Sequence, residues 1–123
     1  MNIFQSANDY NLNQQSVVTI GTFDGVHFGH KKIIEKLIQN AKTLNCQSVI
    51  LTFFPHPRMV LNAQSDIKLL NTINEKSFEL QNLGLQNLII QPFDTTFSNL
   101  TAQQFVKNIL VDKLNIKKII IKF

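Results

Sequence analysis

The stretch VVTIGTFDGVHFGH, residues 17–30, decides the fold of this chain. Its first four residues, Val17–Ile20, are all β-branched, which predicts a buried strand because branched side chains fit a covered, pleated sheet. A turn with three glycines follows, and then the apolar residues of Lys31–Leu44 recur at intervals of three and four. That spacing predicts a helix with one buried face. Its apolar positions are Ile33, Ile34, Leu37, Ile38, Ala41 and Leu44.

The junction between this strand and this helix has the features of an anion-binding turn. Free backbone N–H groups and the positive end of the helix dipole both point out of such a junction. His27 and His30 are three apart, so they share a helix face and can direct two imidazole donors at one phosphate chain. Gly29 leaves room for a phosphate to approach the backbone, and Gly21 and Gly25 either do the same or supply a positive φ. A tight turn with two incidental histidines is the alternative, which the position of the whole string directly after a strand disfavours.

A second buried strand is predicted over Ser48–Phe53, again from its apolar and β-branched residues. A strand, a helix and another strand form a right-handed βαβ unit with parallel strands. Ligands of such sheets bind beyond the carboxyl ends of the strands. We therefore expect Gly21–His30 and Phe54–Arg58 to lie at the same edge of the sheet.

The segment that follows the second strand has a chemistry of its own. Two prolines, Pro55 and Pro57, flank His56 and hold the main chain extended. Together with Phe53 and Phe54 they offer a rigid, apolar wall suited to a flat aromatic ligand. A proline-stiffened loop without a ligand explains the same residues, and the pattern alone does not decide between the two.

The middle of the chain predicts a loop and then a second helix. Met59–Leu70 is weakly periodic and predicts a mobile loop. A capping box of Thr72 and Glu75 opens the helix, and Gly84 ends it. The apolar positions of this helix are Phe78, Leu80 and Leu83.

The last third of the chain predicts a strand, a helix and a final strand. The first strand lies in Leu85–Ile90 and ends at Gln91-Pro92, and the last strand is Lys118–Lys122. A second capping box, Thr101-x-x-Gln104, opens the helix between them, whose apolar positions are Phe105, Ile109 and Leu110. Four strands alternating with helices predict an α/β fold, a Rossmann-like open parallel sheet with flanking helices.

Composition and charge agree with one globular domain. The chain has 123 residues, of which 44% are hydrophobic and 16% charged. The net charge of +4 includes a cluster of lysines. These lysines lie among Ile and Leu without interleaved aromatics, so we expect a solvated helix end and strand edge rather than a nucleic-acid surface. A mildly positive field still favours anionic nucleotides. The lysines are Lys113, Lys117, Lys118 and Lys122.

The expected location is the cytoplasm. The single cysteine, Cys46, cannot form an internal disulfide and is expected to be a structural thiol, which fits a reducing compartment. Residues Met1–Gln15 are polar and lack the basic and apolar regions of a secretory signal. No apolar run approaches the ~18–20 residues that a membrane span needs.

The motifs resemble one known family. GTFDGVHFGH, residues 21–30, resembles the His-x-Gly-His signature of the nucleotidyltransferase superfamily, in the form found in the FMN adenylyltransferase module of bacterial bifunctional riboflavin kinase/FAD synthetase. TFFPHPR, residues 52–58, is similar to that family's Thr-Phe-x-Pro-His-Pro segment. The resemblance runs from Val17 to the end of the chain. Further segments in family order are Leu70-Asn71-Thr72, Glu75-Lys76, Pro92-Phe93-Asp94, Phe97-x-x-Leu100-Thr101-Ala102 and Phe105.

This resemblance implies the reaction FMN + ATP → FAD + pyrophosphate. It assigns His27 to the α-phosphate and His30 to the triphosphate, and it makes the loop at 59–70 a flap beside the flavin. Mg²⁺ is expected to arrive with ATP through phosphate oxygens, with Asp24 either touching it or stabilising the turn. The implied nucleotide-binding residues are Gly21, Thr22, Phe23, Asp24, Gly25, His27, Gly29 and His30. The implied flavin-binding residues are Phe54, Pro55, His56, Pro57 and Leu61.

The match also predicts which parts of the family are absent from residues 1–123. The family's Gly-x-Asn/Asp-Phe-x-Phe-Gly segment, its Ser-Ser-Thr-x-x-Arg-type motif and its riboflavin kinase barrel would all follow Phe123. We therefore expect the N-terminal portion of a C-terminally truncated adenylyltransferase domain, without kinase activity and with weakened catalysis. Two alternatives remain: a nucleotide- or flavin-binding domain that does not turn over, and a nucleotidyltransferase with another acceptor, such as a cytidylyltransferase. The Pro-His-Pro segment argues against the second.

Overall fold

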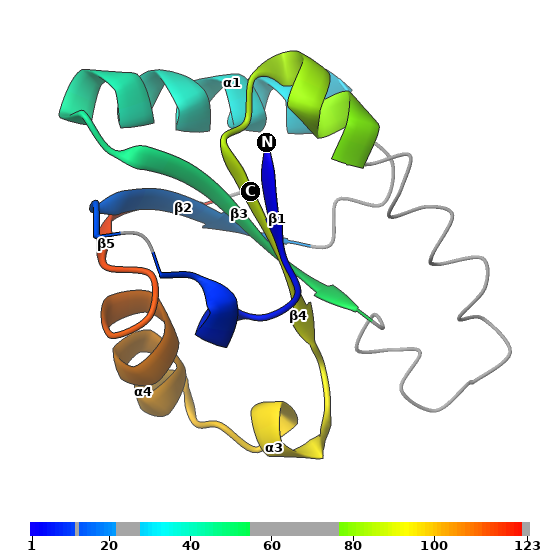
Figure 1. The fold of residues 1–123 in the computed structure, drawn as a ribbon, viewed down its shortest axis with the longest axis vertical. Coiled ribbons are helices and arrows are strands. Elements are labelled where there is room, and N and C mark those ends of the chain that lie inside the picture. Colours follow the sequence, from blue (N-terminus) through cyan, green and yellow to red (C-terminus); the bar gives the residue numbers. More distant parts are fainter. Residues whose placement is uncertain (12, 22–27, 55–76, 122–123) are drawn as a thin grey trace, which may run out of the picture.

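The computed structural model describes residues 1–11, 13–21, 28–54 and 77–121, with only the backbone described at 28–30 and 54. Its centre is a five-stranded sheet in the order β1-β4-β3-β2-β5, and every neighbouring pair of strands is parallel (Figure 1). The strands are β1 (Asn2–Phe4), β2 (Ser16–Ile20), β3 (Gln47–Phe54), β4 (Asn87–Pro92) and β5 (Ile116–Ile120). The predicted α/β fold with an open parallel sheet is confirmed.

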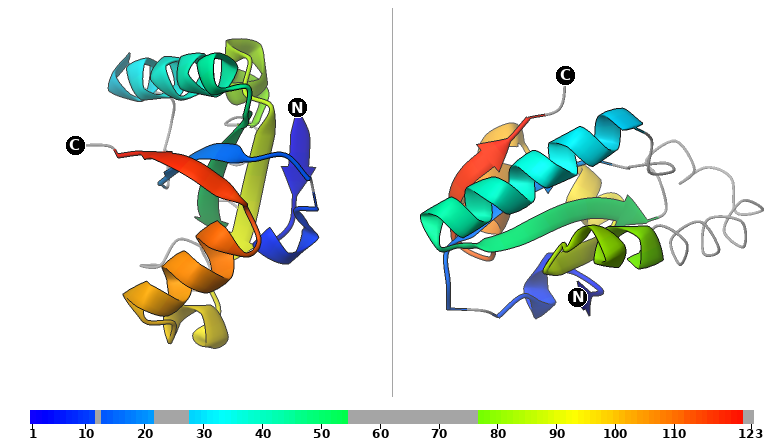
Figure 2. Two further views of the ribbon diagram at one scale, coloured as in Figure 1. Left: turned by 90° about the vertical axis from the view of Figure 1, so that its left-hand side faces the viewer. Right: turned by 90° about the horizontal axis from the view of Figure 1, so that it is seen from above.

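Helices cover both faces of this sheet and make three layers (Figure 2). One face carries the long helix α1 (Phe28–Leu44) and a shorter helical segment at residues 77–83. The opposite face carries the remaining elements, which are η1 (Ala7–Asp9), α3 (Thr95–Ser98), α4 (Ala102–Gln104) and η4 (Phe105–Val111). None of the described helices is long and apolar enough to cross a membrane.

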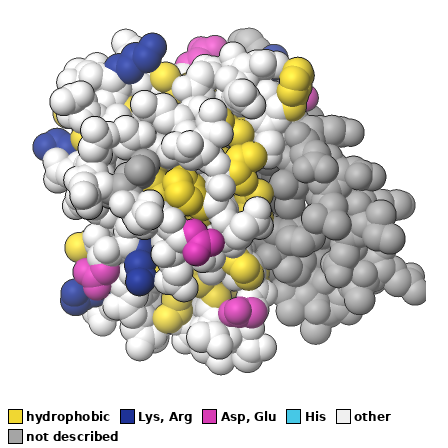
Figure 3. All heavy atoms as spheres, viewed as in Figure 1, with side chains coloured by type: hydrophobic (Ala, Val, Ile, Leu, Met, Phe, Trp, Pro, Cys, Tyr) yellow, Lys and Arg dark blue, Asp and Glu magenta, His cyan; other side chains and the backbone are white. Residues whose placement is uncertain are grey.

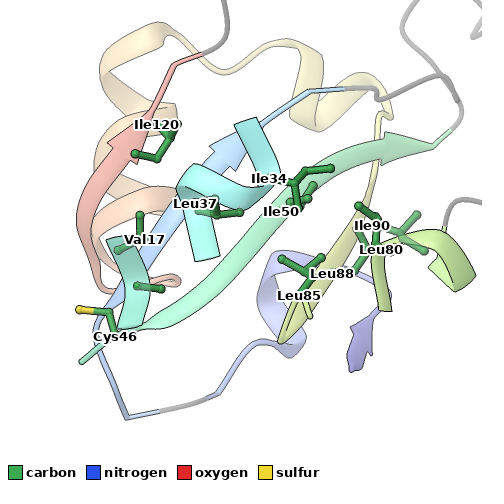
Figure 4. Close-up of a cluster of buried hydrophobic side chains, with 11 residues drawn as sticks. Val17, Ile34, Leu37, Cys46, Ile50, Leu80, Leu85, Leu88, Ile90 and Ile120 are labelled. Carbon is green, nitrogen blue, oxygen red and sulfur yellow. The ribbon is translucent and has the colours of Figure 1, made fainter. Parts of the chain in front are cut away.

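The core on the α1 face is aliphatic. Val17 of β2 and Ile50 of β3 lie under Ile34 and Leu37 of α1, and all four side chains are fully buried (Figure 4). Leu80 joins them from the helical segment 77–83. The predicted buried face of α1 is therefore confirmed, because apolar residues three and four positions apart lie on the side of the helix that meets the sheet.

The opposite face of the sheet has a second core. Successive residues of a strand point to opposite faces, so Val18 faces away from Val17. Its cluster includes Leu51 of β3, Ile89 of β4 and Leu114, which precedes β5. Two buried faces explain why the strands are apolar throughout rather than alternating.

The ends of several elements match their predicted signals. Thr101 and Gln104 form the predicted capping box: the Gln104 backbone N–H donates to Thr101 Oγ1 at 3.1 Å, and the Thr101 N–H donates to Gln104 Oε1 at 2.9 Å. Gly84 has a φ of +98° and ends the helical segment, as predicted. The buried Cys46 is unpaired and donates to the Leu44 carbonyl at 3.4 Å, in agreement with a structural thiol.

Four predictions need correction. The sequence predicts four strands, but β1 is a fifth, with Asn2 opposite Asn87 of β4. Phe78 is 69% exposed and is not an apolar core position. The last strand runs from Ile116 to Ile120 and begins two residues before the predicted Lys118. An edge strand can include exposed residues, and Lys117 and Lys118 are both exposed in it. The helix after the second capping box continues as a π-helix, η4, which its sequence pattern does not distinguish from an α-helix.

The surface carries charges of both signs. On the face shown in Figure 3, acidic and basic side chains are scattered over the described part of the surface. Lys113, Lys117 and Lys118 are exposed at the predicted helix end and strand edge, and Lys118 Nζ donates to Asn40 Oδ1 on α1 at 2.6 Å. The loop at 59–70, the capping box of Thr72 and Glu75, and Lys122 lie outside the described residues.

Candidate functional site

The order in which the chain adds strands to the sheet reverses between β2 and β5: β3 and β4 are added on one side of β2, and β5 is added on the other. After β2 the chain passes through α1 on one face and returns as β3, whereas after β4 it passes through α3, α4 and η4 on the other face and returns as β5. In open parallel sheets, ligands bind outside the carboxyl ends of the strands at such a switch point. We call the side of the sheet where the strands end the carboxyl edge.

At the carboxyl edge, β2 is fixed on both sides. The Gly21 N–H donates to the Leu51 carbonyl at 3.1 Å, and Thr19 Oγ1 donates to the Ile120 carbonyl at 2.8 Å. A depression of about 270 Å³ lies beside this point, lined by Ile20 and by Ile119–Ile121. All four lining side chains are aliphatic, and backbone atoms make up the rest of the lining.

The amino end of α1 points toward the same edge. The helix begins at Phe28, so Phe28, Gly29 and His30 form its first backbone turn, which contains no acidic residue. The helix aligns the peptide dipoles of seventeen residues in all, and the unpaired N–H groups at this end favour an anion. Gly21 and α1 thus bound the turn that the sequence predicts to be the phosphate site. Within it, Thr22, Phe23, Asp24, Gly25 and His27 lie outside the described residues, as does the side chain of His30.

The predicted flavin segment starts at a neighbouring strand end. Phe54 is the last residue of β3, where its backbone lies opposite Pro92 of β4. Since β2 and β3 are adjacent and parallel, Gly21 and Phe54 leave the sheet at the same edge, as the sequence predicts. Pro55, His56, Pro57 and Leu61 lie outside the described residues.

Phe53 was predicted from the sequence to form part of an apolar wall for a flat ligand, but the aromatic cluster at this edge was not predicted. The cluster is formed by Phe53, Phe93, Phe97 and Phe105. The ring centroids of Phe53 and Phe93 are 5.7 Å apart, and Phe97 lies 5.4 Å from Phe53 and 5.9 Å from Phe93. The ring centroids of Phe105 and Phe97 are also 5.9 Å apart. The one sequence signal for this cluster was that Pro92-Phe93-Asp94 and Phe97 match segments of the family in the same order along the chain.

A small pocket of about 200 Å³ adjoins this cluster. Its lining includes Phe97, Gln91, Asp94 and Asn8. The Gln91 carboxamide is held on both sides, since its Oε1 accepts from the Ala7 N–H at 2.7 Å and its Nε2 donates to the Pro92 carbonyl at 3.3 Å. Asp94 caps α3 by accepting from the Phe97 N–H at 2.8 Å. The side chains of Gln91 and Asp94 beside the aromatic rings therefore both hold backbone groups in place.

The chemistry of the described residues does not provide a protein-made metal site. Within residues 1–11, 13–21, 28–54 and 77–121, no three His, Cys, Asp or Glu side chains come together. What the carboxyl edge offers instead is the amino end of a helix, an aliphatic depression and an aromatic cluster. These features fit an anionic ligand with flat rings.

Comparison with known proteins finds similar sequences over most of this chain. The family model described as FAD synthetase matches residues 9–123. A bifunctional riboflavin kinase/FMN adenylyltransferase of Buchnera aphidicola subsp. Schizaphis graminum is 42% identical over 110 residues, or 89% of this chain and 35% of that protein. The proteins of the same name from Listeria monocytogenes and Bacillus subtilis are 40% and 32% identical, over 77% and 89% of this chain and 31% and 34% of their own lengths.

Similarity to a solved structure supports the fold and nothing beyond it. A protein described as a macrolide-efflux protein from Streptococcus pneumoniae superposes with a TM-score of 0.76 at 24% identity, over 97% of this chain and 40% of that one. The chain spans about a third of the length of the curated relatives it matches. Because the family model covers nearly all of its residues, the chain belongs to the FAD synthetase family.

Proposed function

We propose that residues 1–123 form the N-terminal portion of a nucleotidyltransferase domain that transfers AMP from ATP to FMN, giving FAD and pyrophosphate. The observation that carries the proposal is the position of the family signature. GTFDGVHFGH connects β2 to α1 at the switch point of the sheet, where a helix amino end meets the carboxyl edge. The names of the relatives, each a riboflavin kinase/FMN adenylyltransferase, support the same reaction.

The proposed reaction needs charge control more than a base. A phosphate oxygen of FMN attacks the α-phosphorus of ATP, the bond from that phosphorus to the oxygen bridging to the β-phosphate breaks, and pyrophosphate leaves with the electron pair. A phosphate monoester has a second pKa near ~6, so at neutral pH the attacking oxygen carries no proton that must be removed. The barrier is the approach of one anion to another, and it is lowered by positioning and by donors aimed at the developing charge.

The proposed roles follow the geometry of the edge. His27 donates to the α-phosphate and His30 to the triphosphate at the amino end of α1, with the backbone of Gly21–Gly25 and Gly29 around the nucleotide. Flavin binds against Phe54, Pro55, His56, Pro57 and Leu61. Mg²⁺ enters with ATP, bound mainly by phosphate oxygens and water, with Asp24 as its one candidate protein ligand. The proposed place of action is the cytoplasm, which the unpaired, buried Cys46 fits.

The test is FAD formation by the 123-residue chain. FMN, Mg²⁺ and ATP labelled at the α-phosphate are incubated with the protein, and the flavins are separated by chromatography. We expect label in FAD and one pyrophosphate for each FAD formed, with much less product when CTP replaces ATP. Binding of both substrates without FAD would instead support a binding domain that does not turn over. Binding of neither would contradict the proposal.

A further inference from the structure

The strand β5 is joined to the sheet in an irregular way. In the described sheet it lies at one edge and pairs with β2 alone. Ser16 of β2 lies opposite Ile116, but the next residue, Val17, lies opposite Lys118, so Lys117 has no opposite residue. Such a bulge bends a strand and is uncommon in a parallel pair. An edge strand with this irregularity needs further contacts to fix where its end lies.

Two buried hydroxyl groups of β2 supply these contacts. Ser16 Oγ donates to the Leu114 carbonyl at 2.6 Å, just before β5 begins, and Thr19 Oγ1 donates to the Ile120 carbonyl at 2.8 Å, at the last residue of β5. Both side chains are fully buried, where a hydroxyl is unfavourable unless it makes a hydrogen bond. One hydroxyl therefore holds the chain before the bulge, and the other holds it after the bulge.

The two hydrogen bonds lie at opposite edges of the sheet, and only the Thr19 bond is near the candidate site. It adjoins Gly21 and the depression of about 270 Å³ that Ile20 and Ile119–Ile121 line. The proposed function places the phosphates of ATP at the amino end of α1 and the flavin at the end of β3, on the other side of β2. Among the described strand ends beside this turn, the end of β5 is thus the one left for the nucleoside part of ATP.

We propose that Thr19 is a positioning residue for ATP. Its hydroxyl fixes the carboxyl end of β5, and with it the segment Ile119–Ile121, at the distance from the turn between β2 and α1 that a bound nucleotide spans. The inference rests on the proposed function and adds to it a residue that does not touch the ligand, because Thr19 is fully buried and acts through the Ile120 carbonyl. A ligand that is held at both ends binds more weakly when one of its supports is displaced.

The alternative is a hydroxyl that only stabilises the fold, and Ser16 provides the matched control. Thr19→Val removes the hydroxyl and keeps the branched shape, whereas Thr19→Ser keeps the hydroxyl. Ser16→Ala removes the corresponding hydroxyl at the far end of the same strand pair. Ile121→Ala changes the positioned segment at a side chain that is 61% exposed, so it tests the same placement even if Thr19→Val does not fold.

The readouts are calorimetry with ATP–Mg²⁺ for the nucleotide Kd, quenching of FMN fluorescence for the flavin Kd, and the thermal midpoint of each variant. We expect Thr19→Val to raise the ATP Kd about fivefold while the FMN Kd stays within about twofold of wild type. Thr19→Ser should restore ATP binding. Ser16→Ala should lower the thermal midpoint and leave the ATP Kd within about twofold of wild type. Ile121→Ala should weaken the binding of ATP and not that of FMN.

Two results would overturn the inference and leave the proposed function intact. One is an unchanged ATP Kd in Thr19→Val or, if that variant does not fold, in Ile121→Ala. The other is equal weakening of ATP binding by Thr19→Val and Ser16→Ala, which would mean that both hydroxyls serve stability alone. A wild-type chain that binds no ATP would contradict the proposed function itself, and this inference with it.

Discussion

Tyr10 has a hydroxyl group that is buried without a hydrogen-bond partner. The side chain is 4% exposed, its ring packs against Phe4 with centroids 5.2 Å apart, and no described residue bonds its Oη. An unsatisfied buried hydroxyl costs about 1–3 kcal/mol of desolvation. We therefore expect Tyr10→Phe to raise the free energy of unfolding by roughly 1 kcal/mol in urea titrations at neutral pH.

The same burial makes stability depend on pH in the alkaline range. Desolvation raises the pKa of Tyr10 from 10.0 to about 12. The folded chain thus keeps a proton that the unfolded chain releases, so the wild type loses stability as pH rises from the unfolded value of 10.0 toward about 12. Tyr10→Phe lacks this loss, so its advantage in urea midpoint should grow between about pH 7 and pH 11. An advantage that stays constant or shrinks would show that the hydroxyl has a partner or is not buried.

At the scale of single elements, the helical segment at residues 77–83 depends on one side chain. Leu80 is fully buried against the α1 face of the sheet, whereas Phe78, two residues earlier, is 69% exposed. Leu80→Ala should lower the free energy of unfolding by about 2–5 kcal/mol, because the site loses both contacts and the burial of its methyl groups. Phe78→Ala is the matched control and should change it by less than about 0.5 kcal/mol. The measurement is urea unfolding of both variants. A larger loss of unfolding free energy in Phe78→Ala than in Leu80→Ala would mean that the segment packs through its other face.

The elements also show what their sequence could predict. The β-branched run before Gly21 and the regular spacing in α1 are strong local signals, and both elements form where they are predicted. The exposed Phe78 was misplaced because a short helix with several apolar residues does not reveal which of them the neighbouring elements cover. The strand β1 has only three residues, and it exists because β4 offers it an edge to pair with. Such pairing between residues more than eighty positions apart leaves no periodic trace in the sequence.

At the scale of the whole molecule, one topological rule predicted much of the candidate site. A βαβ unit brings the ends of β2 and β3 to one edge, so Gly21 and Phe54 lie where the sequence places them. The aromatic cluster was beyond such reasoning, because its members come from β3, the exit of β4, α3 and η4. Their meeting depends on the position of β4 beside β3 and on the path of the following chain across the opposite face.

The central claim is that ATP binds at the turn between β2 and α1, and the most direct measurement is calorimetric titration with ATP–Mg²⁺. The wild type is compared with His27→Ala/His30→Ala and with His56→Ala, a variant of the third histidine, which lies in the flavin segment. Loss of two donors to phosphate should weaken ATP binding by at least about tenfold in the double variant. His56→Ala should bind ATP as the wild type does. A folded double variant that binds ATP with wild-type affinity would contradict the account.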